Sequence, residues 1–169
     1  MERAELRATR IELLQQMPIF GAIREESVRL LLDRARSVVV AAGGFFFREN
    51  DPADSMYVLE AGRVAVIKTW QGQDFVLHSL GAGDCFGEMA LMDLFPRSAS
   101  VRAEEDCRAI ELAATSLLDL FKHDAEQFAL IQMNIGREVC RRLRATDELL
   151  FRASMGEKNT GPQTLFRSA

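Results

Sequence analysis

From Ser37 onward, short runs of β-favouring residues alternate with turn-forming residues, and this alternation restricts the possible folds more than any other feature of the sequence. The runs predicted as strands are 38–40, 45–47, 56–59, 63–68, 75–80, 98–102 and 108–112. The predicted turns are Gly43-Gly44, Asn50-Asp51-Pro52 and Gln71-Gly72, with a tight hairpin at Ala61-Gly62. Short strands at such close spacing predict an antiparallel barrel or sandwich.

Helical patterns flank the strand region on both sides. On the N-terminal side, apolar residues at near-helical spacing are Leu6, Ile11, Leu14 and Met17, before Pro18 breaks the pattern. Further helices are predicted over 25–36, 116–122 and 125–152. The apolar positions of the longest helix, mostly three or four residues apart, are Phe128, Ile131, Ile135, Val139, Leu143 and Leu150. We therefore predict one domain over 1–153 and a flexible tail over 154–169, where periodicity is lost.

Charge and cysteine content narrow the functional classes. The 21 Lys and Arg residues against 25 Asp and Glu give a net charge of −4, whereas a compact DNA-binding domain usually carries excess positive charge. The three cysteines, Cys85, Cys107 and Cys140, are widely spaced, and with only two histidines they argue against a zinc site. The N-terminal residues lack the apolar core that is typical of a signal peptide, and no apolar run approaches the roughly 20 residues that a spanning helix needs. These features predict a cytoplasmic protein with no membrane segment.

Residues 86–101 read Phe-Gly-Glu-Met-Ala-Leu-Met-Asp-Leu-Phe-Pro-Arg-Ser-Ala-Ser-Val and combine groups suited to a sugar phosphate. Gly87 lets the backbone come close to a ligand, and a short helix beginning there would offer free N–H groups to an anion. Arg97 has a planar fork suited to phosphate oxygens, and Ser98 adds a hydroxyl. Glu88 can accept hydrogen bonds from a sugar hydroxyl. Together these residues predict a compact site for a sugar phosphate.

This segment resembles the phosphate-binding cassette of cyclic-nucleotide-binding domains, which reads Phe-Gly-Glu-Leu-Ala-Leu and then, after a few residues, Pro-Arg-Ser/Ala/Thr-Ala-Ser/Thr-Val. Met89 stands where the family usually has Leu. The likeness extends over about residues 18–151, and further similar segments are Pro18-Ile19-Phe20, 47–54, 61–64 and 80–84. The resemblance implies an α+β fold: an antiparallel β-roll, or jelly-roll-like barrel, of about eight short strands flanked by N-terminal helices and a long C-terminal helix.

The resemblance also implies a role for each matching residue. Glu88 would accept the ribose 2′-hydroxyl, and Gly87 would present its backbone to the ribose. Arg97 would pair with the cyclic phosphate, aided by the Ser98 hydroxyl and the backbone N–H of Ala99. The full set of predicted ligand-binding residues is Val64, Leu77, Leu80, Phe86, Gly87, Glu88, Met89, Ala90, Arg97, Ser98, Ala99 and Thr146.

Recognition of the base is less fully specified than recognition of the phosphate. Candidates for the apolar wall are Val64, Leu77, Leu80 and Phe86, although plain barrel core explains these four residues better than specific base contacts do. Residues 140–147 resemble the matching helix of bacterial cyclic-AMP receptor proteins, in which a Thr-Ser pair reads the adenine amino group. Thr146 matches the Thr, but Asp147 replaces the Ser, so Thr146 is either a base contact or a helix-surface residue. In the family, Ser after the cassette Arg is common with cyclic AMP, so Ser98 favours cyclic AMP and leaves cyclic GMP open.

The resemblance implies a stand-alone cyclic-nucleotide sensor that signals to an unknown effector through movement of the long helix, and the apolar stripe of that helix predicts a homodimer. The alternative is the sensor of a transcription regulator; the short stretch after Arg152 leads us to expect no direct DNA binding. Arg137, Arg141, Arg142 and Arg144 are interpreted as a solvated helix face. An enzyme is not expected, because the cassette has no positioned His or nucleophile and no metal set. Some relatives have a haem-ligating cysteine near the position of Cys85. Here the Gly-Glu and Arg-Ser elements of the nucleotide cassette are intact, so we expect neither haem nor another cofactor.

Overall fold

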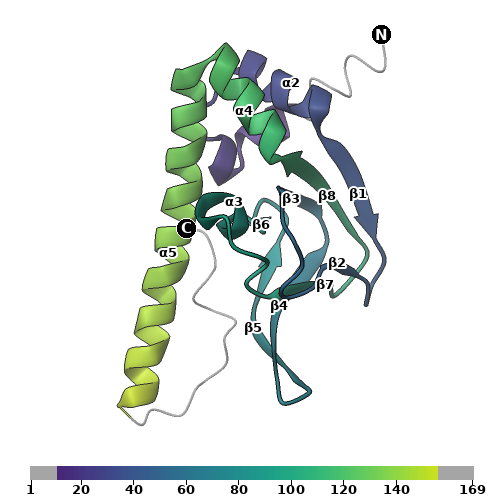
Figure 1. The fold of residues 1–169 in the computed structure, drawn as a ribbon, viewed down its shortest axis with the longest axis vertical. Helices are drawn as coiled ribbons and strands as arrows, with labels where there is room; N and C mark the ends of the chain where they lie inside the picture. Colours follow the sequence, from purple (N-terminus) through teal and green to yellow (C-terminus); the bar gives the residue numbers. More distant parts are fainter. Residues whose placement is uncertain (1–10, 156–169) are drawn as a thin grey trace.

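The strand-forming residues between 36 and 113 build two four-stranded antiparallel sheets in the computed structural model, which describes residues 11–155 (Figure 1). The strands are β1 Arg36–Val40, β2 Phe45–Phe47, β3 Ser55–Ala61, β4 Arg63–Trp70, β5 Gln73–Gly81, β6 Cys85–Phe86, β7 Ser100–Ala103 and β8 Cys107–Ala113. One sheet has the order β1-β8-β3-β6 and the other β2-β7-β4-β5. The predicted antiparallel roll of about eight strands is therefore confirmed.

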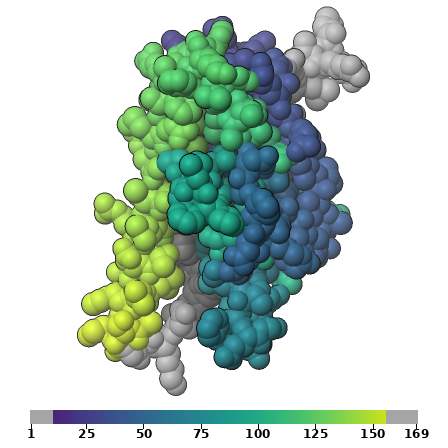
Figure 2. Space-filling model, in the orientation of Figure 1, coloured from purple at the N-terminus to yellow at the C-terminus, as the bar shows by residue number. Residues whose placement is uncertain are grey.

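Helices cover one end and one flank of this roll. Residues 11–15 are helical, and the further helices are η1 Pro18–Phe20, α2 Glu25–Arg34, α3 Met89–Asp93, α4 Ala114–His123 and α5 Ala125–Ser154. Figure 1 shows α2, α4 and the first half of α5 grouped at one end, while α5 continues along the flank. In the space-filling view, α3 fills the surface between α5 and the strands (Figure 2). Leu6 and residues 156–169 of the predicted tail lie outside the described residues.

The hairpin predicted at Ala61-Gly62 is wrong. β3 and β4 belong to different sheets, so the chain crosses between the sheets at Gly62 instead of turning back on itself. The backbone here has φ +94°, and a Cβ on Gly62 would lie 2.7 Å from the carbonyl oxygen of Asp106. Both the conformation and the close approach require glycine. A glycine between two strands is compatible with a tight turn, but the local sequence does not determine that β3 pairs with β8 and β6 instead of β4.

The turn predicted at Gln71-Gly72 is confirmed as the hairpin between β4 and β5. Trp70 pairs with Gln73, and both central residues have positive φ, at 51° for Gln71 and 77° for Gly72. Positive φ at both central residues is typical of the type I′ turn, whose twist matches that of the flanking strands. This hairpin extends beyond the rest of the roll (Figure 1).

Two hydrophobic clusters stabilise the fold, and the cassette begins where they meet. The first packs the helices onto the sheet containing β3 and β8, with members such as Phe20, Leu31, Met56, Leu112, Leu120 and Ile131. The second fills the roll, with Tyr57, Leu59, Val64, Leu80, Phe86, Val101 and Ala109 among its members. Cys85 belongs to the first cluster and Phe86 to the second. The two-residue strand β6, which the sequence analysis missed, therefore anchors the segment that follows it in both clusters.

The long helix leaves the core partway along its length. Ile131 and Ile135 are buried, whereas Leu143 and Leu150 are 58% and 66% exposed. Asp124 caps the start of α5, where its carboxylate accepts a hydrogen bond from the backbone N–H of Gln127 at 3.2 Å. Within residues 11–155, α5 included, none of the helices combines the length and the apolar character needed to cross a bilayer.

Candidate functional site

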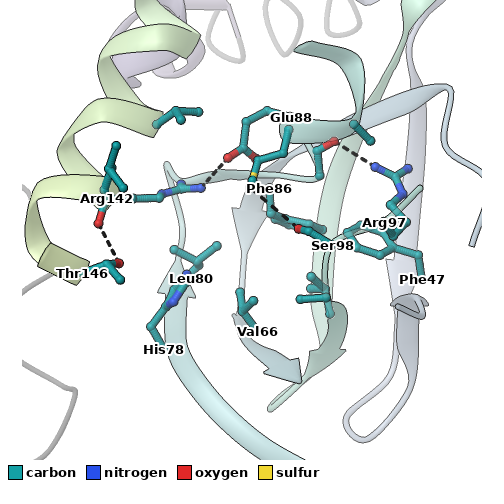
Figure 3. Close-up of a pocket in the computed structure, with 17 residues that line it drawn as sticks. Phe47, Val66, His78, Leu80, Phe86, Glu88, Arg97, Ser98, Arg142 and Thr146 are labelled. Carbon is teal, nitrogen blue, oxygen red and sulfur yellow. Dashed lines mark hydrogen bonds and ion pairs between the residues drawn. The ribbon is translucent and has the colours of Figure 1, made fainter. Parts of the chain in front are cut away.

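A cavity of about 370 Å³ lies between the roll and α5 (Figure 3). Its lining residues are Phe47, Val66, His78, Leu80, Phe86, Gly87, Glu88, Met89, Ala90, Arg97, Ser98, Ala99, Val101, Val139, Arg142, Leu143 and Thr146. They come from β2, β4, β5, β6, α3, β7 and α5, together with the segments next to α3. The volume lies within the usual range of small-molecule sites.

Most of the predicted ligand-binding residues meet in this cavity. Those that line it are Leu80, Phe86, Gly87, Glu88, Met89, Ala90, Arg97, Ser98, Ala99 and Thr146. Val64 and Leu77 are not among the lining residues. Val64 is fully buried in the roll, and Leu77 is 45% exposed on β5. The pairing of β4 with β5 explains Leu77, because Val66 pairs with His78 and Ile67 with Val76, which leaves Leu77 as the extra residue of a β-bulge.

Arg97 is a buried cation without a neutralising partner. It is 4% exposed, and among the described residues it forms no ion pair with a carboxylate. Its Nη1 donates to the Gly87 carbonyl at 2.9 Å and its Nη2 to the Ser55 hydroxyl at 3.3 Å, while Nε has no hydrogen-bond partner. The guanidinium carbon lies 4.1 Å from the centroid of the Phe47 ring. Burial lowers the pKa of Arg97, and the more distant carboxylates of Asp54, Glu111 and Asp51 offset this only in part. Because a guanidinium remains charged, the cavity contains a positive charge that no ion pair neutralises among the described residues.

The backbone around Arg97 is held by the cassette and by the loop between β2 and β3. Gly87 has φ +76°, and a Cβ there would lie 2.5 Å from Nη1 of Arg97, so only glycine leaves room for the guanidinium. The backbone N–H of Arg97 donates to the carbonyl of Asp51 at 3.0 Å, and that of Asn50 donates to the carbonyl of Arg97 at 2.9 Å. Arg97 is therefore fixed at both its backbone and its side chain.

A second arginine, Arg142 of α5, enters the cavity and is neutralised there. Its Nη1 donates to Oε1 of Glu88 at 3.0 Å, and its Nη2 donates to the carbonyl of Cys85 at 2.6 Å. Glu88 is only 4% exposed. Burial alone would lower the pKa of Arg142, but the carboxylate of Glu88 raises it above its ordinary value. The two arginines thus differ: Arg142 connects α5 to the cassette through an ion pair, whereas Arg97 forms no ion pair with any described residue.

The interpretation of Arg142 as part of a solvated helix face is wrong. Arg142 lies three residues after Val139 and four before Thr146, and all three line the cavity. This spacing of three and four marks one face of a helix. Applied to Thr146, which the sequence analysis had already selected, the same spacing would have found Arg142.

His78 also lines the cavity and was not selected from the sequence. Burial, and then the nearby charge of Arg142, lower the pKa of His78 to about 4, so its imidazole is neutral near pH 7. Figure 3 shows His78 and Thr146 on the side of the cavity away from Arg97 and Phe47. The Thr146 hydroxyl donates to the backbone carbonyl of Arg142 at 3.0 Å. The cavity therefore has hydrogen-bonding groups at both ends.

Between these two ends the walls are mainly apolar, formed by Val66, Leu80, Phe86, Val101, Val139 and Leu143. A free cation at one end and neutral polar groups at the other suit an organic anion with a flat apolar part. Across residues 11–155, no three or more His, Cys, Asp and Glu side chains are grouped so that they could hold a metal ion.

The family model for the cyclic nucleotide-binding domain matches residues 37–124 of the chain. The chain is 33% identical over 135 residues to the cyclic AMP receptor protein of Thermus thermophilus, an alignment that covers 77% of this chain and 59% of the relative. It is 31% identical over 99 residues to the cAMP-dependent protein kinase regulatory subunit of Emericella nidulans, covering 59% of this chain and 24% of that protein.

Among solved structures, the fold is similar to the crystal structure of the Thermus thermophilus catabolite activator protein. The TM-score is 0.70 at 32% sequence identity, and the match covers 81% of this chain and 63% of the other. The chain therefore spans less than two thirds of the length of these relatives.

Proposed function

The chain belongs to the cyclic nucleotide-binding domain family, and from that membership we propose that it is a sensor module that binds cyclic AMP. The observation that carries the proposal is Arg97, a buried guanidinium that forms no ion pair with a carboxylate within residues 11–155. A buried charge without a partner is costly, and a bound anion removes that cost. A cyclic phosphate meets the requirement, since its oxygens accept the planar pattern of guanidinium donors.

The remaining groups of the cavity fit the rest of a cyclic nucleotide. In the proposed pose the cyclic phosphate lies at Arg97, next to the Ser98 hydroxyl and the backbone N–H of Ala99. The ribose 2′-hydroxyl donates to Glu88, and the purine lies between the apolar walls formed by Val66, Leu80 and Leu143. Thr146 and His78 then face the base from the end of the cavity opposite Arg97.

Two observations favour cyclic AMP over cyclic GMP. The relatives described above are named as a cyclic AMP receptor and as a subunit of a cAMP-dependent kinase. In addition, Ser98 follows Arg97, at the position where Thr often accompanies cyclic GMP. We therefore propose cyclic AMP as the ligand and retain cyclic GMP as the competitor to test.

The proposed output is a movement of α5. Because Arg142 pairs with Glu88, a ligand that hydrogen-bonds to Glu88 changes the contact that holds α5 on the cassette. A ligand shifts α5 only by binding its two arrangements with different affinity. The exposed apolar residues Leu143, Leu150 and Phe151 of α5, with Met155 directly after it, support a homodimer formed along α5.

The proposal extends to the biological setting. We propose a binding role and not a catalytic one, in the cytoplasm, with residues 1–153 as the functional domain and an effector protein as partner. The alternative is the sensor part of a transcription regulator, which the 59% coverage of the cyclic AMP receptor keeps open. Incubation with cyclic AMP followed by analysis of the products tests the non-catalytic role, since turnover would contradict it.

The test of the site is calorimetric titration with cyclic AMP and cyclic GMP. Loss of a hydrogen bond to a charged group costs about 1.5–3 kcal/mol, so Arg97→Ala is expected to weaken binding about ten- to a hundredfold. Arg97→Lys recovers only part of the affinity, because an ammonium lacks the planar fork. Arg48→Ala is the matched control: Arg48 also stacks on a phenylalanine, 3.9 Å from the Phe45 ring, but lies outside the cavity. Equal affinity of Arg97→Ala and wild type would refute the phosphate assignment.

A further inference from the structure

Phe47 and Arg97 form the closest contact between an aromatic ring and a cation in the cavity. The guanidinium carbon of Arg97 lies 4.1 Å from the Phe47 ring centroid, and the ring lines the cavity. A Cβ on Gly87 would lie 3.1 Å from Cε1 of Phe47 and 2.5 Å from Nη1 of Arg97. Gly87, Phe47 and Arg97 are therefore packed tightly together, as Figure 3 shows for the two labelled side chains.

A break in strand pairing places Phe47 in this position. β2 pairs with β7 through Phe45 opposite Arg102 and Phe47 opposite Val101, with a shift of register between them. In a regular strand consecutive side chains point to opposite faces. Here the irregularity lets both Phe46 and Phe47 pack against Tyr57 and Phe86 inside the roll. The fold thus brings two adjacent aromatic rings to the same side, and only the second contacts Arg97.

The aromatic face solves a problem that a carboxylate would not. A long side chain with a buried charge must be held in place to bind a ligand. A carboxylate would hold it, as Glu88 holds Arg142, but would also neutralise it. A ring face attracts a cation through its quadrupole while carrying no net charge. Arg97 is held by Phe47, the Gly87 carbonyl and the Ser55 hydroxyl, all of which are uncharged.

We infer that Phe47 is a positioning residue: its ring holds the Arg97 guanidinium in the binding orientation without neutralising it. This inference rests on the proposed function, because it concerns how the same site keeps its affinity for a cyclic phosphate. It adds a residue outside the cassette, separated from Arg97 by 50 positions in the chain.

The test is a double-mutant cycle between Phe47 and Arg97, read by calorimetric titration with cyclic AMP. Phe47→Leu is expected to weaken binding about five- to tenfold, within the range for a partly desolvated cation over a ring. Phe47→Tyr keeps a ring face and is expected to stay within about twofold of wild type. In the Arg97→Ala background, Phe47→Leu is expected to change affinity by less than about twofold, because the group it positions is gone.

Phe46→Leu is the matched control, since Phe46 packs on Tyr57 and Phe86 but does not line the cavity. Thermal melting checks that each variant is folded, and Phe47→Met replaces Phe47→Leu if the latter does not fold. An equal loss on Phe47→Leu with and without Arg97 would overturn the inference and leave Phe47 as a plain wall residue. Absence of cyclic AMP binding by the wild type would instead overturn the proposed function itself, so the two failures are distinguishable.

Discussion

Arg142 of α5 and Glu88 at the start of α3 form an ion pair, with 3.0 Å between Nη1 and Oε1, in which the side chains are only 16% and 5% exposed. The same guanidinium donates to the carbonyl of Cys85, so one side chain of α5 contacts both β6 and α3. Removal of one partner from a buried pair leaves the other charge uncompensated. The position of α5 against the cavity therefore depends on this contact.

Arg142→Gln is expected to lower the free energy of unfolding by about 3 kcal/mol, because Glu88 then stays buried without its cation. Urea unfolding followed by circular dichroism measures the loss. The control on the same helix is Arg152→Gln, since Arg152 and Glu148 form an exposed pair at 2.8 Å. That change should cost no more than about 0.5 kcal/mol. Equal losses in the two variants would show that the Glu88 contact contributes no more than a surface pair.

Gly87→Ala should weaken cyclic AMP binding at least about tenfold, because the new Cβ would lie 2.5 Å from Nη1 of Arg97 and must displace it. The matched control is Gly83→Ala. Gly83 has φ +95°, comparable to +76° at Gly87, but nothing lies within 4 Å of its Cβ position. Both variants bear the backbone strain of a positive φ, about 1 kcal/mol in melting experiments. If titration gives the two variants the same affinity, the close approach at Gly87 is not what shapes the site.

The cassette could be predicted from sequence because its parts lie within one short segment. Gly87, Glu88, Arg97 and Ser98 are neighbours in the chain, and the structure brings all of them to one cavity. Their order along the chain is enough to predict a sugar-phosphate site without knowledge of the fold. The same holds for the turn at Gln71-Gly72, which local backbone preference determines.

The residues that were missed reach the cavity through contacts between distant segments. Phe47 depends on a register shift between β2 and β7, and His78 lines the cavity next to a β-bulge at Leu77. Arg142 depends on the packing of α5 against β6. The spacing of apolar residues predicts regular helices and strands. It predicts neither a shift of register within a strand nor which element a helix packs against. For the same reason Gly62 was read as a hairpin, although the chain changes sheets there.

His78 should make the fold less stable as the pH falls. Its pKa is lowered from 6.5 to about 4, so between these values the unfolded chain binds a proton that the folded protein does not. Stability is therefore retained above pH 6.5 and lost progressively towards pH 4, by at most about 3 kcal/mol from this group. Urea unfolding at several pH values should show a flatter profile for His78→Gln than for wild type. His123→Gln is the control, and identical profiles for wild type and His78→Gln would contradict the assignment.

The three cysteines should differ sharply in reactivity. Cys140 is exposed, whereas Cys85 and Cys107 are buried. Burial raises the pKa of Cys85 to about 12 and also raises that of Cys107, so neither supplies the thiolate that reacts with a maleimide. Mass spectrometry after brief labelling of the native protein should find one modified cysteine, and Cys140→Ser should abolish the rapid labelling. Rapid modification of Cys85 in the folded protein would show that β6 opens readily.

The apolar end of α5 should support a dimer in solution. Leu143 and Leu150 are one heptad apart, and Leu150, Phe151 and Met155 are each at least 60% exposed. Light scattering of the wild type is expected to give twice the monomer mass of 19.0 kDa. Leu150→Glu places a charge in the contact and, since Leu150 does not line the cavity, should give a monomer that still binds cyclic AMP. Leu118→Glu, at a leucine that is 49% exposed on α4, is the control and should remain dimeric. A wild-type protein that is monomeric at every concentration, with and without cyclic AMP, would rule out the dimer. A Leu150→Glu variant that remains dimeric would show that the dimer interface lies outside this stretch of α5.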